Sequence, residues 1–273
     1  MVTTPRPLEP FGLALVTGAS SGIGRALAQD LVHRGYDVVV CAEDEELAEV
    51  AAELSETGRE VVAVRADLAV ADEVERLHRE VERLGRPVDV LCLNAGVGVG
   101  GRFPETDLEA DLRLVDLNVR SLVHLAKLVV REMLSRGQGR ILVTSSIAAT
   151  APGPFHATYA ASKAFGHSFA EGIRTELKDT GVTVTSLMPG PTDTEFFARA
   201  DMLDTKIGKG PKDDPADVAR AGLDALFAGK DSVVAGSFKN RIQAEVATHL
   251  PDKVTAPVMG SMAKPHEEAG DRG

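Results

Sequence analysis

Thr17-Gly-Ala-Ser-Ser-Gly-Ile-Gly24 decides how this chain folds, because it joins the apolar run Leu13–Thr17 to a stretch with helical periodicity. Its glycines, Gly18, Gly22 and Gly24, lie where a strand would turn into a helix. A backbone without side chains can approach a phosphate closely, and the first turn of a helix attracts anions. The spacing G-x-x-x-G-x-G differs from the common dinucleotide fingerprint and from a P-loop, since no Lys-Ser/Thr follows the last glycine. The run therefore predicts a nucleotide-binding turn or a purely structural one.

Further apolar runs alternate with stretches of helical periodicity. They are Leu13–Thr17, Val38–Cys41, Val61–Val64, Val88–Asn94, Ile141–Ser145 and Val182–Met188. A last strand is expected at Ser232–Ala235, after a helix with Asp214 as its cap and Pro215 at its first position. Such alternation is typical of a parallel sheet covered by helices on both faces. We therefore predict an α/β fold, a doubly wound parallel sheet of about seven strands in one domain.

The size and charge of the chain limit the classes of protein to which it can belong. With 273 residues, 28.8 kDa and 44% hydrophobic residues, it can bury a substantial core as one large domain. The formal charge of −11 and the pI near 5.2 oppose a surface that follows a phosphate backbone, and no basic stripe is interleaved with aromatic residues. Nucleic acid is therefore not expected as a partner.

The two cysteines, Cys41 and Cys92, each fall inside an apolar run, which favours buried free thiols over a disulfide or a metal site. No metal site is predicted. The N-terminal stretch has no apolar signal core, and no apolar run reaches the length of a membrane span. These features predict a cytoplasmic protein that has no membrane partner.

Tyr159 and Lys163 lie four residues apart in Tyr-Ala-Ala-Ser-Lys, far downstream of the glycine run. Four residues are about one helical turn, so both side chains project from the same face of a helix. A nearby ammonium stabilises a tyrosinate that otherwise forms only at about pH 10, which makes the phenol useful as a proton donor and acceptor. Such pairs also occur by chance on solvated helices, so this pair gains weight only from the motifs around it.

Three further motifs accompany the pair. Asn94-Ala-Gly96 closes the fourth apolar run, Asn118 lies in a following helical stretch, and Ser146 follows the fifth run. With the glycine run and the tyrosine–lysine pair, in this order and at these spacings, they make the chain resemble the short-chain dehydrogenase/reductase family in its single-domain form. The resemblance covers roughly residues 12 to 236. It implies a Rossmann-type fold and an NAD(P)-dependent oxidoreductase.

The resemblance also implies which residues hold the cofactor. The glycine loop would bind the diphosphate, Asp67 and Leu68 would flank the adenine, and the segment after the sixth run would support the nicotinamide. The implied cofactor contacts are Gly18, Ser20, Ser21, Gly22, Ile23, Gly24, Glu43, Asp67, Leu68, Asn94, Gly96, Tyr159, Lys163, Pro189, Gly190, Thr192 and Thr194. Asn94 can equally serve to tie two strands together.

Glu43, just after the second run, bears on the choice between NAD and NADP. A carboxylate there accepts hydrogen bonds from ribose hydroxyls and repels a 2′-phosphate. Relatives that use NADP often carry arginine at this position, and NAD-dependent relatives often carry aspartate where this chain has Ala42, so the chain matches neither pattern. We expect NAD to be preferred, unless Glu43 points to solvent.

The implied chemistry is hydride transfer between the nicotinamide and a ketone or secondary alcohol, with Tyr159 as general acid and base. The resemblance assigns Ser146 to the substrate oxygen and Lys163 to lowering the tyrosine pKa and binding the ribose. It assigns Asn118 to holding a water that joins the lysine to solvent, whereas a solvated or backbone-bonded asparagine is the alternative. Ser145 is the alternative candidate for this role, and only the spacing between Ser146 and Tyr159 favours Ser146.

The amphipathic stretch Glu195–Gly210 lies where the family covers its substrate cleft. Its apolar side predicts a pocket for a largely apolar substrate and a segment that closes over it, although the same residues could simply pack on the body or on another subunit. The predicted substrate contacts are Phe155, Phe196, Phe197 and Met202. Val97 to Phe103 would form another wall, and His156 is expected to be a wall residue without a chemical role.

These assignments suggest how the chain is divided. We expect an N-terminal leader (1–11), a dinucleotide-binding catalytic domain (12–250) with a lid insertion around 190–212, and an irregular C-terminal tail (251–273) that contains several prolines and glycines.

The family also pairs two long helices across a two-fold axis, here about Leu108–Arg136 and Ala157–Thr180, which implies a homodimer or homotetramer. The apolar residues available for that interface, or for packing on the sheet, are Leu117, Leu122, Leu125, Leu128 and Val129.

Two other functions fit parts of this pattern. A non-catalytic NAD(P)-binding regulatory protein would share the fold, but it would be expected to lack the tyrosine or the lysine. A sugar-nucleotide epimerase or dehydratase uses the same pair, but usually with G-x-x-G-x-x-G and a larger C-terminal substrate domain. Both patterns fit this chain less well than the dehydrogenase pattern.

Overall fold

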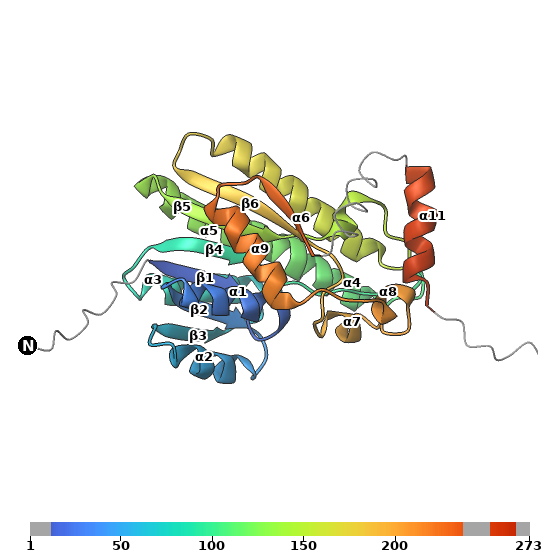
Figure 1. Cartoon of the computed structure of the whole chain (residues 1–273), viewed down its shortest axis with the longest axis horizontal. Helices are drawn as coiled ribbons and strands as arrows, with labels where there is room; N and C mark the ends of the chain where they lie inside the picture. The colour runs from blue at the N-terminus through green and yellow to red at the C-terminus, as the bar shows by residue number, and fades with distance from the viewer. Residues whose placement is uncertain (1–11, 237–251, 266–273) are drawn as a thin grey trace, which may run out of the picture.

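The computed structural model describes residues 12–236 and 252–265, and at its centre lies one parallel sheet (Figure 1). Seven strands make up the sheet in the order β3-β2-β1-β4-β5-β6-β7, and each neighbouring pair is parallel. The strands are β1 (Leu13–Thr17), β2 (Asp37–Ala42), β3 (Val61–Arg65), β4 (Val88–Leu93), β5 (Gly139–Thr144), β6 (Val182–Pro189) and β7 (Ser232–Ala235). The predicted fold is confirmed, and every predicted strand is present within one or two residues of its expected bounds.

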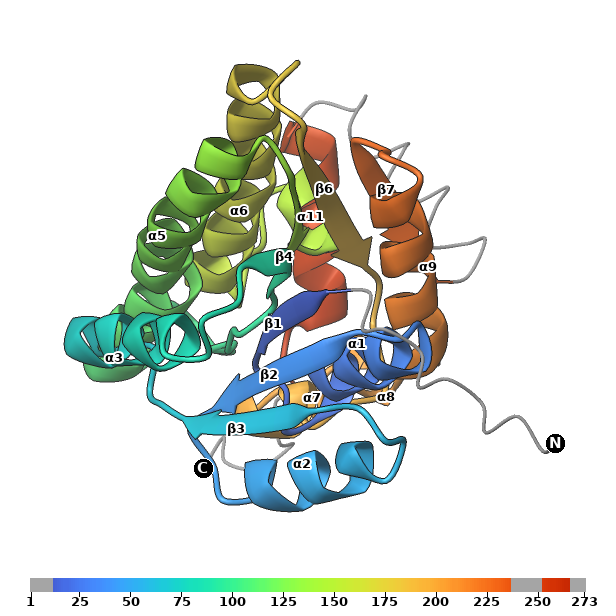
Figure 2. The same cartoon turned by 90° about the vertical axis from the view of Figure 1, so that its left-hand side faces the viewer.

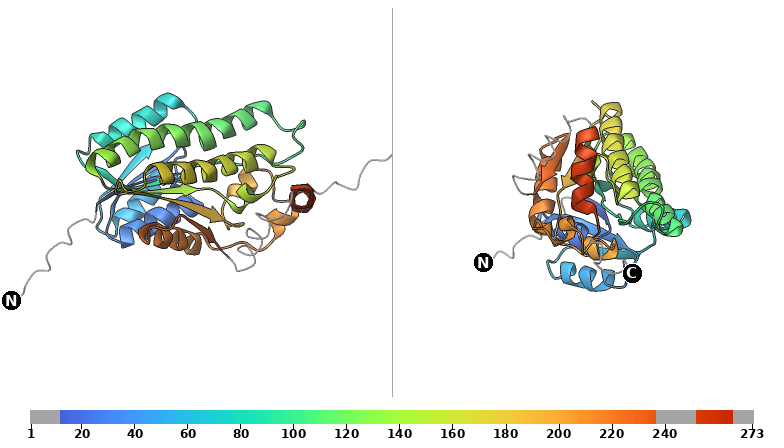
Figure 3. Two further views of the ribbon diagram at one scale, coloured as in Figure 1. Left: turned by 90° about the horizontal axis from the view of Figure 1, so that it is seen from above. Right: turned by 90° about the vertical axis from the view of Figure 1, so that its right-hand side faces the viewer.

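Helices cover both faces of the sheet, as Figures 2 and 3 show. On one face lie α3 (Ala71–Glu82), α5 (Ser121–Arg136) and α6 (Ala157–Glu176). On the other lie α1 (Gly22–His33), α2 (Leu47–Ser55) and α9 (Pro215–Phe227). α9 begins as predicted, because the Asp214 side chain accepts a hydrogen bond from the Ala216 N–H and proline occupies the first helical position.

Strand residues bury side chains on both faces, so two apolar clusters flank the sheet. Leu15, Leu91 and Ile141 belong to the cluster under α3, α5 and α6, whereas Val16 and Leu142 belong to the cluster on the opposite face. This two-sided burial explains the continuous apolar runs in the sequence. The strand order reverses between β1 and β4, and sheets of this kind bind ligands in the crevice outside the carboxyl ends of the strands at that point.

The helical stretch 108–136 is not the continuous α-helix that the sequence predicts. It is divided into α4 (Leu108–Val115), a π-helical turn over Asp116–Arg120, and α5. Asn118 lies inside that turn, is only 4% exposed, and exchanges two hydrogen bonds with the Val97 backbone. These bonds hold the asparagine against the loop after β4, and π-turns of this kind often occur at functional sites.

The apolar residues that the sequence offered either for a subunit interface or for packing on the sheet pack on the sheet. Leu117, Leu122, Leu125 and Val129 are buried in the cluster beneath α3, α5 and α6, and Leu128 packs partly against it. The apolar residues that stay exposed on α4 are different ones, Leu108, Leu112 and Val115. The sequence could not separate the two sets, because both follow helical spacing.

The sequence predicted an irregular C-terminal tail, but part of that tail is helical in the structure. Residues Asp252–Ala263 form a helix, α11, although Pro257 lies inside it. Ala263 is 2% exposed and clusters with Phe197 and Met202, so tertiary contacts stabilise a helix with weak apolar periodicity. The expected leader (1–11), the end of the catalytic domain (237–250), and residues 251 and 266–273 of the tail lie outside the described residues.

The side chains of Cys41 and Cys92 are buried free thiols, as predicted. Burial raises the pKa of each thiol to about 12, so neither is poised to react as a thiolate near neutral pH. Within the part of the chain that the structure describes, no helix combines the length and the apolar character needed to cross a bilayer.

Candidate active site

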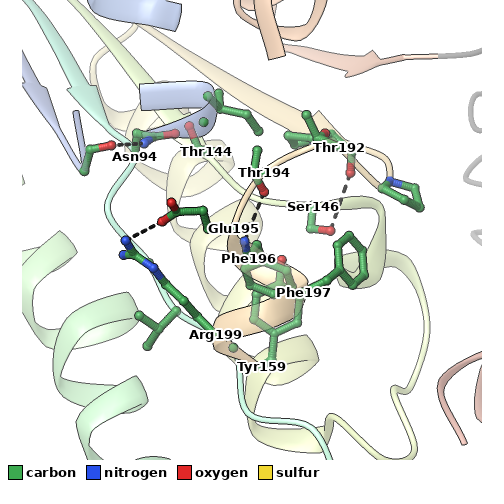
Figure 4. A pocket seen from close by; sticks show the side chains of 18 of the residues that line it. Asn94, Thr144, Ser146, Tyr159, Thr192, Thr194, Glu195, Phe196, Phe197 and Arg199 are labelled. Carbon is green, nitrogen blue, oxygen red and sulfur yellow. Dashed lines mark hydrogen bonds and ion pairs between the residues drawn. The ribbon is translucent and has the colours of Figure 1, made fainter. Parts of the chain in front are cut away.

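A cavity of about 490 Å³ lies along the carboxyl edge of the sheet. The loop after β1 lines one end, and Tyr159 lines the other together with the 190–212 segment, which contains α7 (Phe196–Arg199) and α8 (Lys206–Lys209). Figure 4 shows side chains of this second end. Every cofactor contact predicted from the sequence lines this cavity: Gly18, Ser20, Ser21, Gly22, Ile23, Gly24, Glu43, Asp67, Leu68, Asn94, Gly96, Tyr159, Lys163, Pro189, Gly190, Thr192 and Thr194.

The glycine loop has the geometry of a phosphate cradle. Gly18 and Gly22 have φ angles of +65° and +52°, which residues with a side chain rarely adopt. The first N–H groups of α1 lie beside these glycines. A Cβ on Gly24 would lie 1.9 Å from the Gly18 carbonyl oxygen, so the turn admits only glycine there. The residues present therefore fit a dinucleotide diphosphate at the positive end of a helix.

Asn94 supports this loop from β4. Its side-chain amide donates to the Thr17 carbonyl over 3.1 Å, and its backbone N–H donates to the Thr17 hydroxyl over 3.0 Å. Both bonds tie the end of β4 to the end of β1. The structural alternative for Asn94 is thus present, and its side chain also lines the cavity.

Two carboxylates follow β2 at the far end of the cavity. Glu43 forms an ion pair with Arg113 of α4, and the Asp44 side chain accepts a 2.8 Å hydrogen bond from the Ser20 hydroxyl. Arg113 also donates to Asp67 over 2.9 Å. Partial burial tends to raise the pKa of Asp67, but the hydrogen bonds from Arg113 and the Ala69 N–H outweigh it and hold the pKa below its usual value.

Tyr159, Ser146 and Lys163 meet in the cavity, as their spacing predicts. The Ser146 side chain lies close enough to the Tyr159 hydroxyl to favour its anionic form, and the Lys163 ammonium lies 5.8 Å from the centre of the Tyr159 ring. Lys163 donates a 3.0 Å hydrogen bond to the Thr144 carbonyl at the end of β5. Ser145 instead donates to the Lys163 carbonyl, so of the two candidate serines it is Ser146 that reaches the tyrosine.

The expected effect of the lysine on the tyrosine pKa does not dominate in this structure. Burial raises the pKa of Tyr159 to about 12, although the nearby Ser146 side chain lowers it in part. Burial also lowers the pKa of Lys163 to about 8, below its usual 10.5. Both shifts have one cause, since a site shielded from water disfavours either charged form.

A stability prediction follows for Lys163→Met. Because the folded lysine has a pKa of about 8 and the unfolded one 10.5, the unfolded chain binds more protons between these pH values, and stability rises with pH across that window. Between pH 7.5 and 9.5 the wild type should gain about 2 kcal/mol of unfolding free energy relative to the variant. Urea denaturation at both pH values measures it. Parallel pH curves for the two proteins would contradict the buried ammonium.

Asn118 does not line the cavity in this structure. Its amide oxygen accepts from the Val97 N–H, and its amide nitrogen donates to the Val97 carbonyl and to the Ser162 hydroxyl. A Cβ on Gly96 would lie 3.1 Å from the Asn118 amide oxygen and 3.2 Å from the Lys163 ammonium, which places both groups close to that glycine. The backbone-bonded alternative is therefore what the structure shows, and the water relay stays a prediction.

The predicted substrate residues separate into two groups. Phe196, Phe197 and Met202 line the cavity, and the Phe196 ring centre lies 4.9 Å from that of Tyr159 (Figure 4). Phe155 lies instead beside a neighbouring cavity of about 360 Å³, next to Arg102. Phe155 also packs against the cluster that contains Phe197, Ala200 and Met202, so its contact with the substrate stays a prediction.

His156 lines the main cavity and its ring centre lies 6.3 Å from that of Tyr159. Burial lowers its pKa, while the adjacent Pro154 backbone opposes that effect. The imidazole is thus held largely neutral near pH 7. These contacts agree with its expected place in the wall.

Sequence reasoning missed several residues around the cavity. Asp44 adjoins Glu43, so its acidic neighbour was a usable signal. Arg113 gave no signal, because its carboxylate partners are 46 and 70 positions away. Met259 and Met262 of α11 also line the cavity, and nothing in the sequence of the tail pointed to them.

The fold and the cavity define a class of protein. A glycine-rich loop at the point where strand order reverses, with a tyrosine, serine and lysine in the same cavity, is the arrangement of an oxidoreductase that uses a nicotinamide dinucleotide. The family model for short chain dehydrogenases matches residues 12–202. The chain belongs to the short-chain dehydrogenase family, and it is an NAD(P)-dependent oxidoreductase.

Individual relatives agree with this. An uncharacterised oxidoreductase from Staphylococcus saprophyticus is 35% identical over 216 residues, which cover 78% of this chain and 90% of that protein. The solved structure of a short-chain dehydrogenase from Sphingobium yanoikuyae in complex with NADPH is 26% identical, with a TM-score of 0.77, and covers 96% of this chain and 99% of its own. The bulky-bulky ketone specific alcohol dehydrogenase from Comamonas testosteroni is 25% identical, with a TM-score of 0.75, and covers 95% and 98%.

Proposed function

We propose that this protein transfers a hydride between the nicotinamide of NAD(P) and a largely apolar ketone or secondary alcohol, with Tyr159 as general acid and base. One observation carries the proposal. Tyr159 and Ser146 both line the cavity that also contains the glycine loop, so a proton donor and a dinucleotide cradle share one space.

Each residue of the site has its own part in the reaction. The bound cofactor supplies or accepts the hydride. During reduction Tyr159 gives its Oη proton to the substrate oxygen, and during oxidation it takes that proton back. Ser146 Oγ donates a hydrogen bond to the same oxygen and stabilises the charge that develops on it. Lys163 Nζ stands beside the tyrosine and favours its anionic form whenever the lysine is protonated.

An apolar substrate fits the walls near Tyr159. Phe196 and Phe197 pack edge to face with ring centres 5.5 Å apart, and Met202 lies behind them with 4% exposure. Apolar walls around a few polar groups are typical of small-molecule sites. The relative from Comamonas testosteroni, which is specific for bulky-bulky ketones, supports the same substrate class.

NAD is proposed as the preferred cofactor. Glu43 and Asp44 both line the cavity after β2, and each puts a carboxylate where a 2′-phosphate would be repelled. We expect a lower dissociation constant for NADH than for NADPH. The double variant Glu43→Gln/Asp44→Asn should shift this preference toward NADPH by about tenfold, because like charges at about 4 Å repel by about 1 kcal/mol in water. Nicotinamide fluorescence measures both constants.

Glu45→Gln provides the matched control for that variant. Glu45 pairs with Arg65, is 83% exposed and does not line the cavity, so its loss should leave the preference unchanged. Wild-type protein that binds NADPH as tightly as NADH would overturn the assignment.

A homodimer or homotetramer is proposed as the solution state. Leu108, Leu112 and Val115 form a stripe on α4 and are 67%, 50% and 40% exposed, and Phe165 of α6 is 39% exposed. An apolar stripe at helical spacing on the surface is typical of an interface. Multi-angle light scattering at micromolar concentration should show an oligomer, and Leu108→Glu/Leu112→Glu should dissociate it. Wild-type monomers would contradict the proposal, and circular dichroism should show the variant folded.

A screen of ketones and secondary alcohols with NADH, NADPH and their oxidised forms tests the function, with nicotinamide absorbance as the readout. Turnover that consumes added cofactor supports a dehydrogenase acting on small molecules. Cofactor binding without turnover of any ketone or alcohol would favour the regulatory alternative. Turnover that needs no added nicotinamide, with cofactor retained through purification, would favour the epimerase alternative.

A further inference from the structure

The helix α11 closes the substrate end of the cavity. Met259 and Met262 lie three residues apart, which places them on one face of the helix, and both line the cavity that contains Tyr159. Val258 faces away and is 55% exposed. Figure 1 shows α11 beside α7 and α8, beyond the carboxyl edge of the sheet.

Packing on two sides holds α11 in this place. On one side Ala263 clusters with Phe197, Ala200 and Met202 of the 190–212 segment. On the other, Gly260 lies so close to the loop before α6 that an added Cβ would come within 3.3 Å of Pro154. The helix therefore bridges the two loops that flank the mouth of the cavity, and the positions of its methionines are determined by packing.

An aromatic and an aliphatic side chain also line the cavity that these methionines line. Phe196 lies 4.9 Å from Tyr159, ring centre to ring centre, and Ile207 of α8 lines the same end. Thioether sulfur packs favourably against aromatic rings, and methionine adapts its shape to what it contacts. Polar side chains also line this cavity, among them Ser146, Tyr159, His156, Thr192, Thr194, Glu195, Arg199, Lys206 and Lys212. The Lys212 ammonium is already placed over the Phe197 ring and bonded to the Gly208 carbonyl.

We propose that Met259 and Met262 form a specificity wall, and that the substrate is a flat ring ketone, fused or aryl, or its secondary alcohol. This inference rests on the proposed function. The ring system packs between Phe196 and the two thioethers, and the carbonyl points to Tyr159 and Ser146. A small acyclic ketone would satisfy the polar pair but leave the methionine wall without contact, so the wall discriminates by apolar area.

The test compares 2-tetralone with 2-butanone as substrates. Wild-type protein should use 2-tetralone with a kcat/KM about 100-fold higher, since each methylene-sized contact is worth about tenfold or more. Met259→Ala/Met262→Ala should raise the KM for 2-tetralone about tenfold or more and leave the kcat/KM for 2-butanone and the NADH dissociation constant unchanged. Val258→Ala, on the outer face, should change none of these.

A binding measurement keeps the two proposals distinguishable. In a Tyr159→Phe background with NADH present, calorimetric titration of 2-tetralone should show the same tenfold loss of affinity on removing the methionines. Met259→Leu/Met262→Leu keeps the volume of the wall and should retain most of the affinity. Equal losses for both ketones, or equal affinity with and without the methionines, would overturn the α11 wall. Tight binding of 2-tetralone without turnover by wild-type protein would support the wall and refute the proposed hydride transfer.

Discussion

Tyr159→Phe is expected to lower turnover by about 10²- to 10⁴-fold, the usual contribution of a general acid or base. The variant removes the hydroxyl and keeps the ring that packs against Phe196. The dissociation constant for NADH should therefore stay close to the wild-type value. Steady-state kinetics with an accepted ketone and a fluorescence titration with NADH measure the two effects separately.

Tyr36→Phe is the matched control, because Tyr36 is the only other tyrosine of the chain. Its ring is buried on the opposite face of the sheet, stacked with Phe227 at 5.8 Å between ring centres, and it does not line the cavity. This variant should keep its activity. Substantial activity in Tyr159→Phe would remove the tyrosine from the proposed mechanism.

Gly24→Ala is expected to abolish cofactor binding and to destabilise the fold by about 3 kcal/mol or more, near or above the upper end for overpacked sites. The added Cβ would lie 1.9 Å from the Gly18 carbonyl oxygen and 2.6 Å from the Asn94 amide nitrogen. The carbonyl belongs to the backbone, so no rotamer change can relieve the clash. Either the loop opens or α1 moves away from β1.

Gly172→Ala provides the comparison on α6, where nothing lies within 4 Å of the added Cβ. Alanine there should stabilise the protein by about 0.5 to 1 kcal/mol, because glycine weakens a helix interior by that amount. Urea denaturation of both variants measures the stabilities. A fully stable Gly24→Ala that binds NADH normally would contradict the glycine loop described above.

The sequence predicted the central strands well because they carry side chains buried on both faces. The run Val38–Cys41 has no polar residue, and a sheet covered on two sides accommodates it. The helices were predicted less well. The π-helical turn over Asp116–Arg120 depends on bonds to Val97, a residue 21 positions from Asn118, and no local pattern encodes such a contact.

The site shows the same division. The glycine loop, Ser146, Tyr159 and Lys163 were found because each acts through a spacing that one short stretch of chain contains. The sequence did not predict that the pKa of Tyr159 is raised, because this shift depends on how much water the surrounding loops exclude.

The sequence by itself determined the fold class and the family, and it predicted Ser146, Tyr159 and Lys163, which line one cavity, because periodicity and local motifs are properties of neighbouring residues. Only the tertiary structure decided which carboxylates face the cavity after β2, which leucines remain exposed on α4, and that α11 supplies Met259 and Met262 to the substrate wall. These features arise where segments distant in the sequence pack together. The free energy that places them comes from contacts that exist only in the folded chain.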